Sequence, residues 1–137
     1  MQTTSVIEKN FDVSFSIDDC HKAIELIIPK FTYLCDNKSK TTNYYRLRKA
    51  SGAAAAAFDV TFKTLEENKT SISLNCIATN NIRNLQNQII EDFVINIGLA
   101  LEGKMEELDV RAKKDSTSFI IWIVLFIILG GLALIFI

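Results

Sequence analysis

The chain has few of the residues on which specialised sites are usually built. It contains three cysteines and one histidine, and its 15 Lys and Arg nearly balance its 16 Asp and Glu. The odd cysteine count without paired spacing (Cys20, Cys35 and Cys76) argues against a disulfide framework. The near-neutral charge excludes a strongly basic nucleic-acid-binding domain. A length of 137 residues leaves room for one compact domain, which excludes a large multidomain enzyme.

Catalytic signatures are also missing. The sequence has no phosphate-binding glycine loop, and its only histidine, His21, stands next to Cys20. Adjacent residues on a helix point about 100° apart, so these two side chains do not form a Cys–His pair. A metal site needs three or four ligands at suitable spacing, whereas the cysteines offer no CxxC pair. Asp18 and Asp19 are explained by a helix N-cap as well as by an acid pair. We therefore predict a protein that is not an enzyme and has no cofactor or metal ion.

Charged side chains are absent from the end of the chain. Residues 119–137 comprise 17 hydrophobic residues and two glycines. The 20 residues from 118 to 137 span ~30 Å as a helix, the thickness of the hydrocarbon core of a bilayer. This run predicts one C-terminal transmembrane helix that acts as a tail anchor, and it excludes a multi-span transporter.

Basic residues precede this run and predict its orientation. Arg111, Lys113 and Lys114 lie on its N-terminal side, and the positive-inside rule then places the N-terminal domain in the cytoplasm. Trp122 falls where an indole suits the membrane interface. We expect a single-pass membrane protein in contact with membrane lipid, with residues 104–117 as a charged juxtamembrane linker.

Hydrophobic periodicity predicts the fold of residues 1–103. Apolar and polar residues alternate in several short runs, which is typical of half-buried strands (residues 11–17, 32–35, 44–48, 58–63 and 71–76). Helical spacing begins after Asp19, and Pro29 should end or bend that helix in its last turn. A long amphipathic helix follows from Asn81 and ends at Gly103. We predict an α+β two-layer sandwich in the order β-α-β-β-β-α, with an antiparallel sheet of four or five strands and two helices on one face.

Residues 48–52 (Arg-Lys-Ala-Ser-Gly) lead into residues 58–62 (Phe-Asp-Val-Thr-Phe), a Glu-Glu-Asn-Lys-Thr turn follows at 66–70, and the helix from Asn81 to Gly103 closes the domain. This arrangement resembles small α+β domains of TBP-like or helix-grip type. The resemblance covers roughly residues 6–103 and rests on topology and turn placement. It brings no catalytic or binding signature with it. Helix-grip domains often hold apolar ligands, so the resemblance implies that this domain could hold one as well.

Two surface features are candidates for contact. Four residues of the predicted sheet should share the face turned away from the helices and form a candidate interaction face (Tyr44, Arg46, Arg48 and Lys63). Tyrosine beside arginine can grip an anionic group, and a solvated surface is the simpler alternative. The small residues from Ser51 to Ala57 allow close backbone approach, either in a tightly packed strand entry or at a shallow contact surface.

Two functions fit these features. The first is a non-catalytic interaction module at the cytoplasmic membrane surface, which binds a protein partner or a second copy of itself and no nucleic acid. The second is a domain that binds lipid or another apolar ligand between the sheet and the long helix. A domain of this size needs most of its apolar side chains for its own core, so the sequence favours the first function.

Overall fold

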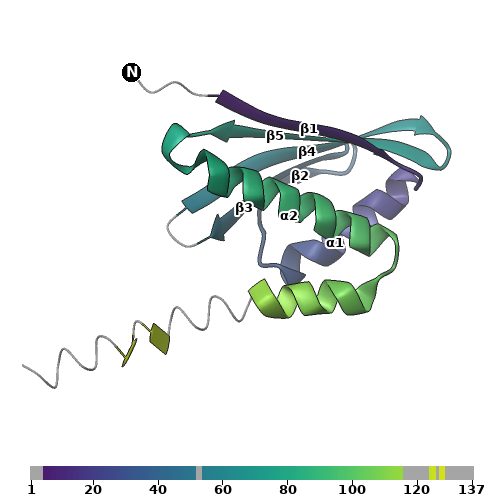
Figure 1. Ribbon diagram of the computed structural model, residues 1–137. Coiled ribbons are helices and arrows are strands. Elements are labelled where there is room, and N and C mark those ends of the chain that lie inside the picture. Colours follow the sequence, from purple (N-terminus) through teal and green to yellow (C-terminus); the bar gives the residue numbers. More distant parts are fainter. Residues whose placement is uncertain (1–4, 52–53, 116–123, 126, 129–137) are drawn as a thin grey trace, which may run out of the picture.

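The computed structural model describes residues 5–51, 54–115, 124–125 and 127–128. Figure 1 shows a curved sheet with helices beneath it. The elements are β1 (Ser5–Val13), α1 (Ile17–Lys30), β2 (Leu34–Ser39), β3 (Tyr44–Ser51), β4 (Ala54–Glu66), β5 (Lys69–Ala78), the 3₁₀ turn η1 (Asn80–Ile82) and α2 (Arg83–Leu101). A further helix spans residues 105–115.

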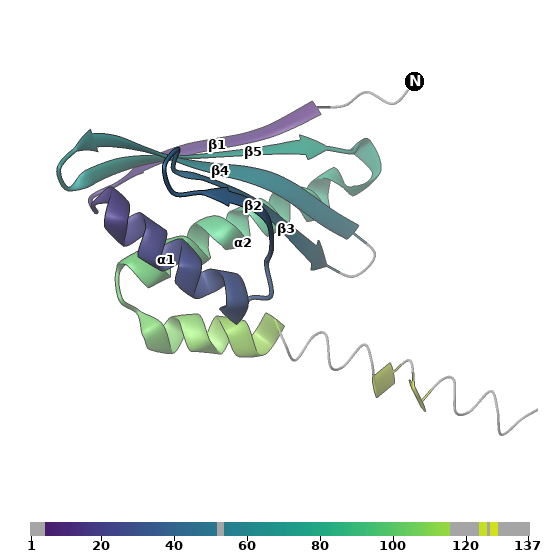
Figure 2. The ribbon, with the colours of Figure 1, turned by 180° about the vertical axis from the view of Figure 1, so that it is seen from behind.

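The five strands form one antiparallel sheet in the order β1-β5-β4-β3-β2. Figures 1 and 2 show α1 and α2 on the same face of this sheet. The predicted α+β sandwich with an antiparallel sheet is therefore confirmed. Four strands follow α1, so the sheet has five strands, within the predicted four or five, although the predicted order β-α-β-β-β-α lists only three after the first helix. The edge strand β2 is polar and almost entirely exposed, so it carries no alternation by which its length could be read.

Local chemistry accounts for both ends of α1. The Ser16 hydroxyl accepts a hydrogen bond from the backbone N–H of Asp19 at 3.2 Å, so Ser16 is the N-cap and the two aspartates lie in the first turn. Pro29 lies in the last turn, where it was expected to end the helix. The chain leaves α1 through Thr32 at φ 56°, a left-handed conformation that is strained for a β-branched residue. The N–H of Tyr33 then donates to the carbonyl of Ile28 at 2.9 Å and closes the helix end.

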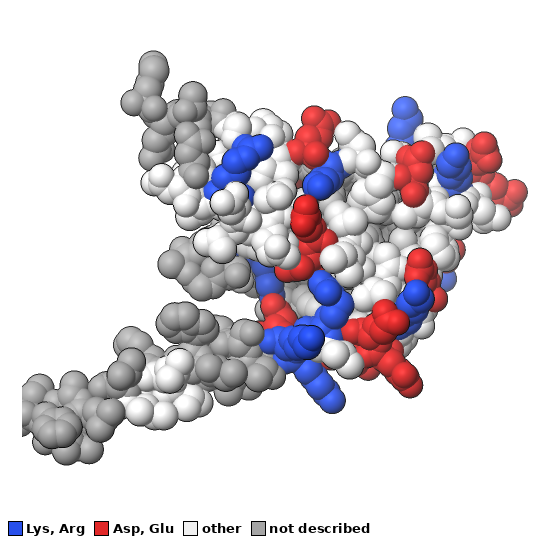
Figure 3. All heavy atoms as spheres, in the orientation of Figure 1, with Lys and Arg blue, Asp and Glu red and all other residues white. Residues whose placement is uncertain are grey.

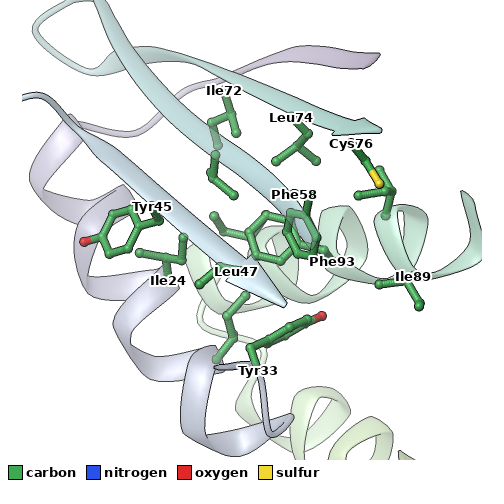
Figure 4. Packing of buried hydrophobic residues seen from close by; sticks show 14 of the residues in the cluster. Ile24, Tyr33, Tyr45, Leu47, Phe58, Ile72, Leu74, Cys76, Ile89 and Phe93 are labelled. Atoms are coloured by element: carbon green, nitrogen blue, oxygen red, sulfur yellow. The ribbon is translucent and has the colours of Figure 1, made fainter. Parts of the chain in front are cut away.

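The core lies between the sheet and the two helices. Figure 4 shows Phe58 of β4 and Phe93 of α2 facing each other across this layer. Their ring centroids are 5.2 Å apart, and the Phe93 ring also lies 5.7 Å from that of Tyr33, both in edge-to-face geometry. The apolar face expected of this amphipathic helix places Ile89, Phe93 and Ile97 in the core, whereas Leu85, one turn earlier at the same four-residue spacing, is 49% exposed. The helix ends before Gly103, whose φ of +71° suits glycine.

Part of the run of small residues predicted as a tight strand entry or a contact surface (Ser51 to Ala57) packs against α2. Ala56 is completely buried, and the backbone carbonyl of Ala55 accepts a hydrogen bond from the Gln86 side chain of α2 at 3.4 Å. The other end of that amide accepts from the backbone N–H of Thr79 at 2.9 Å. The small side chains thus allow the start of α2 to approach β4 closely.

Residues 105–115 form a helix in the stretch expected to be a charged linker. Figures 1 and 2 show this helix beneath α1, on the side of the helices away from the sheet. Leu108 is completely buried in the core, and Lys30 at the end of α1 forms an ion pair with Asp109. In Figure 3, basic and acidic side chains both lie in the region of this helix, in neighbouring groups, so no single sign of charge marks it. The buried leucine attaches the segment to the domain, and Arg111 and Asp115 on the same side of the helix form ion pairs with Asp92 and Lys49.

No helix within the described residues is both long enough and apolar enough to cross a membrane. This finding contradicts the predicted transmembrane helix, and with it the tail anchor, the single-pass assignment and the cytoplasmic placement derived from it. A span needs about 20 consecutive, predominantly apolar residues. The longest described helix, α2, has 19 residues and carries Arg83, Glu91 and Asp92. The predicted span, 118–137, lies outside the described residues except for positions 124, 125, 127 and 128.

Candidate functional site

A cavity of about 240 Å³ opens where the end of α1, β3, α2 and the 105–115 helix meet. Three of its nine lining residues are apolar or aromatic, and the other six carry charged or amide groups. Its lining consists of Phe31, Tyr33, Lys49, Ile89, Asp92, Asn96, Arg111, Lys114 and Asp115. Binding sites for small molecules combine apolar walls with a few polar groups that fix orientation. The composition of this cavity fits that description.

A chain of hydrogen bonds crosses the cavity wall. The buried Asn96 side chain donates to the Tyr33 hydroxyl at 3.3 Å, and its carbonyl oxygen accepts from Nε of Arg111 at 2.8 Å. The same guanidinium donates from Nη2 to Asp92 at 3.3 Å. Arg111 therefore joins the 105–115 helix to α2 with a fixed orientation. A fixed polar group at the edge of an apolar wall is suited to orienting a ligand.

Lys49 supplies a second fixed cation. It follows Tyr45 and Leu47 on β3 at the strand's two-residue period, so it points toward the helices. Its ammonium group donates to the carbonyl of Phe31 and to the Thr32 hydroxyl at 3.2 Å, and it lies 5.5 Å from the centroid of the Tyr33 ring. Asp115 completes the set with an ion pair of 2.7 Å. The strained turn at Thr32 thus brings together a carbonyl, a hydroxyl and an aromatic ring around one lysine.

Burial raises the pKa of the two core tyrosines, Tyr33 and Tyr45, well above the ordinary value of 10.0. In the unfolded chain both phenols ionise near pH 10, whereas in the fold they resist ionisation. Stability from these groups is therefore complete below pH 10 and is lost as the pH rises toward the folded values.

We expect the free energy of unfolding to fall first near pH 9, where the thiols of Cys20 and Cys76 ionise in the unfolded chain but not in the fold. Above about pH 10 it should fall further, by up to about 1.4 kcal/mol per pH unit for each tyrosine. In the Tyr33→Phe variant the free energy of unfolding should fall less steeply with pH, because one of the two phenols is no longer present to ionise. Urea titrations across this range, combined with tyrosinate absorbance, test the expectation. It fails if both core phenols ionise near pH 10 while the circular dichroism remains that of the folded chain.

A second hollow, of about 490 Å³, lies between α1 and the turn before β3. His21 lines it, and both nitrogens of its ring have partners. Nδ1 lies 2.7 Å from the Tyr45 hydroxyl, and Nε2 lies 2.8 Å from the side-chain oxygen of Asn43. The imidazole also packs edge-on against Phe62 at 5.2 Å. His21 therefore links α1 to the sheet.

The candidate interaction face lies where the alternation places it, on the side of the sheet away from the helices. Tyr44 donates a hydrogen bond to Asp59 at 2.6 Å, and Arg46 forms an ion pair with the same carboxylate at 2.9 Å. This carboxylate raises the pKa of both the Tyr44 phenol and the Arg46 guanidinium. Arg48 pairs with Asp36 at 3.1 Å, and Lys63 is exposed. Much of the positive charge predicted for this face is therefore compensated by neighbouring acids.

The residues predicted to flank a membrane have different locations. Arg111 and Lys114 line the cavity, and Lys113 is exposed on the same helix. Trp122 lies outside the described residues. The basic cluster was recognised in the sequence, but its position beside Asn96 and Asp92 depends on how the 105–115 helix packs.

The cysteines do not gather into a site within the described part of the chain. Cys20 and Cys76 are buried, and burial raises the pKa of both thiols. Cys35 is exposed on the edge strand. Over residues 5–51, 54–115 and the four described positions beyond them, no group of three or more His, Cys, Asp or Glu is placed to hold a metal ion.

Of the nine residues that line the cavity, only Arg111 and Lys114 were predicted from the sequence as functional residues, and for another role. Three of the seven that were missed are polar residues that hold the site together. Lys49 breaks the apolar row of β3, and Asn96 is a buried amide beside Ile97 in the apolar stripe of α2. Asp115 was assigned to the linker. A polar residue at a position that periodicity assigns to the core is the signal that could have identified the first two.

No protein-family model matches the chain, and a comparison with curated proteins gave no significant match. A comparison with solved structures gave matches at low sequence identity. Ara h 8.0201 is 12% identical with a TM-score of 0.52, over 77% of this chain and 99% of that one. A protein of unknown function from Staphylococcus aureus is 11% identical with a TM-score of 0.47, over 77% and 98%. A START superfamily protein from Mycobacterium smegmatis is 12% identical with a TM-score of 0.42, over 75% and 98%.

Of these three structures, the first has a TM-score above 0.5, and at 12% identity it shows a common fold only. The fold-level resemblance to small helix-grip α+β domains is supported. The TBP-like part of that resemblance is not confirmed.

Proposed function

We propose that this domain binds a small, largely apolar ligand in the cavity between α2 and the 105–115 helix. The observation that carries the proposal is the cavity itself, where Phe31, Tyr33 and Ile89 meet fixed polar groups. It favours the second of the two functions considered from the sequence. The interaction face on the opposite side of the sheet has much of its charge internally paired.

The size of the cavity limits the ligand. Sites for drug-sized molecules measure about 300 to 1,000 Å³. At about 240 Å³ the cavity suits a smaller molecule, such as a medium-length aliphatic chain or a single aromatic ring. The partly exposed side chains of Asp92, Arg111 and Asp115 lie at its rim and leave a route from solvent.

Cavity filling tests the proposal. 1-Octanol is a neutral probe of suitable size, and the full chain should bind it with chemical-shift changes concentrated on α2 and the 105–115 helix. Ile89→Phe places a larger side chain in the wall and should weaken octanol binding at least about tenfold, with an overpacking penalty of about 1–3 kcal/mol in stability. Leu85→Phe, at an exposed position one turn earlier on α2, should bind octanol as the native chain does.

Equal octanol binding by Ile89→Phe, Leu85→Phe and the native chain, with circular dichroism showing all three folded, would place the probe outside this cavity. Absence of octanol binding to the native chain would overturn the proposed function.

A further inference from the structure

Lys49 presents a nearly buried ammonium group to the cavity. Its side chain is 12% exposed, and its donors reach the carbonyl of Phe31, the hydroxyl of Thr32 and the carboxylate of Asp115. A cation taken out of water needs an anionic partner, because loss of hydration is otherwise uncompensated. Within the described residues, Asp115 is the carboxylate that reaches it.

The two members of this pair differ in how firmly they are held. Lys49 lies on the sheet and is fixed by neutral groups of the turn after α1. Asp115 comes from the 105–115 helix, and its side chain is 37% exposed at the rim of the cavity. The Asp115 side chain can therefore turn outward into solvent without disturbing the sheet, whereas the Lys49 side chain stays in place. The position opposite Lys49 is therefore one that another carboxylate can occupy.

The charge of the lining favours an anion there. Arg111 is paired with Asp92 and Lys49 with Asp115. If Asp115 turns outward, Lys49 is left with neutral hydrogen-bond partners, and no other carboxylate among the described residues that line the cavity is paired with it. The apolar walls at Phe31, Tyr33 and Ile89 restrict the rest of the molecule to hydrocarbon or an aromatic ring.

We infer that the ligand of this cavity is an amphipathic carboxylate whose anionic group binds Lys49 in place of Asp115. This inference rests on the proposed function and specifies the ligand class. Asp115 acts as an internal competitor: it pairs with Lys49 when no ligand is bound, and the carboxylate of the ligand displaces it. No covalent step is involved.

Octanoate and 1-octanol form a matched pair of probes, because they share a chain length and differ in charge. Calorimetric dissociation constants for both, measured on the full chain, give a preference ratio. The native chain should prefer octanoate, Lys49→Met should lose the preference, and Asp115→Asn should raise octanoate affinity roughly tenfold while leaving octanol affinity within about twofold. A gain of affinity in Asp115→Asn cannot come from a damaged fold.

Asp109→Asn is the matched control. Asp109 belongs to the same helix and pairs with Lys30, but neither residue lines the cavity. Its preference ratio should equal that of the native chain. Similar binding of both probes to the native chain, or an octanoate affinity unmoved by Asp115→Asn, overturns the carboxylate inference and leaves the proposed function standing. Failure of both probes to bind overturns both.

Discussion

The Phe93→Ala variant is expected to lose about 3–5 kcal/mol of unfolding free energy. Phe93 is completely buried at the centre of α2, and its ring packs edge-to-face against both Phe58 and Tyr33. Truncation removes the apolar surface and leaves a cavity beneath the helix. Since domains of this size are stable by only about 5–15 kcal/mol, the variant should be near the limit of folding. Urea titration followed by circular dichroism measures the loss.

Ile95→Ala supplies the control for this substitution. Ile95 lies two positions further on the same helix with its side chain 46% exposed, so its loss should stay within about 0.5 kcal/mol. A Phe93→Ala loss below 1 kcal/mol would contradict the packing of α2 against the sheet.

The second large effect concerns the attachment of the 105–115 helix. Leu108 is completely buried, and it is the one fully buried hydrophobic residue among the described residues 105–115. Leu108→Ala should therefore lower the free energy of opening this helix by about 2–5 kcal/mol. Amide hydrogen exchange should accelerate across the whole helix, while β4 and β5 keep their protection.

Val110→Ala removes an apolar side chain from the same helix at a position that is 55% exposed. Exchange in this control should remain close to that of the native chain. If Leu108→Ala and Val110→Ala exchange alike, the helix is not held by its buried leucine, and the cavity wall that it forms is not a stable feature.

Much of the fold could be predicted because it depends on local patterns. Alternation in β3, β4 and β5 showed which side chains face the helices, and Tyr45, Leu47, Phe58 and Val60 are indeed buried. The helical spacing from Leu85 to Leu101 identified the buried face of α2 over Ile89 to Ile97, although Leu85 itself is exposed, and Gly103 marked the end of the helix. The edge strand β2 escaped prediction beyond its first residues, because an exposed strand has no apolar face to alternate.

The transmembrane prediction rested on hydropathy alone. The run from 119 to 137 is apolar throughout, yet the described part of the chain contains no helix able to cross a membrane. The orientation, the anchor and the reading of Arg111 as a membrane flank all depended on that single run. In the structure, Arg111 instead bonds to Asn96 and Asp92.

The sequence by itself determined the near-neutral charge, the α+β class, the antiparallel sheet and the two helices on one of its faces, because each follows from composition or from spacing within one element. The cavity was decided by tertiary structure alone. Tyr33 and Asn96 are 63 positions apart, and Lys49 and Asp115 are 66 apart. Periodicity reports which face of an element is buried, whereas the partner of a buried polar group depends on which distant elements pack together.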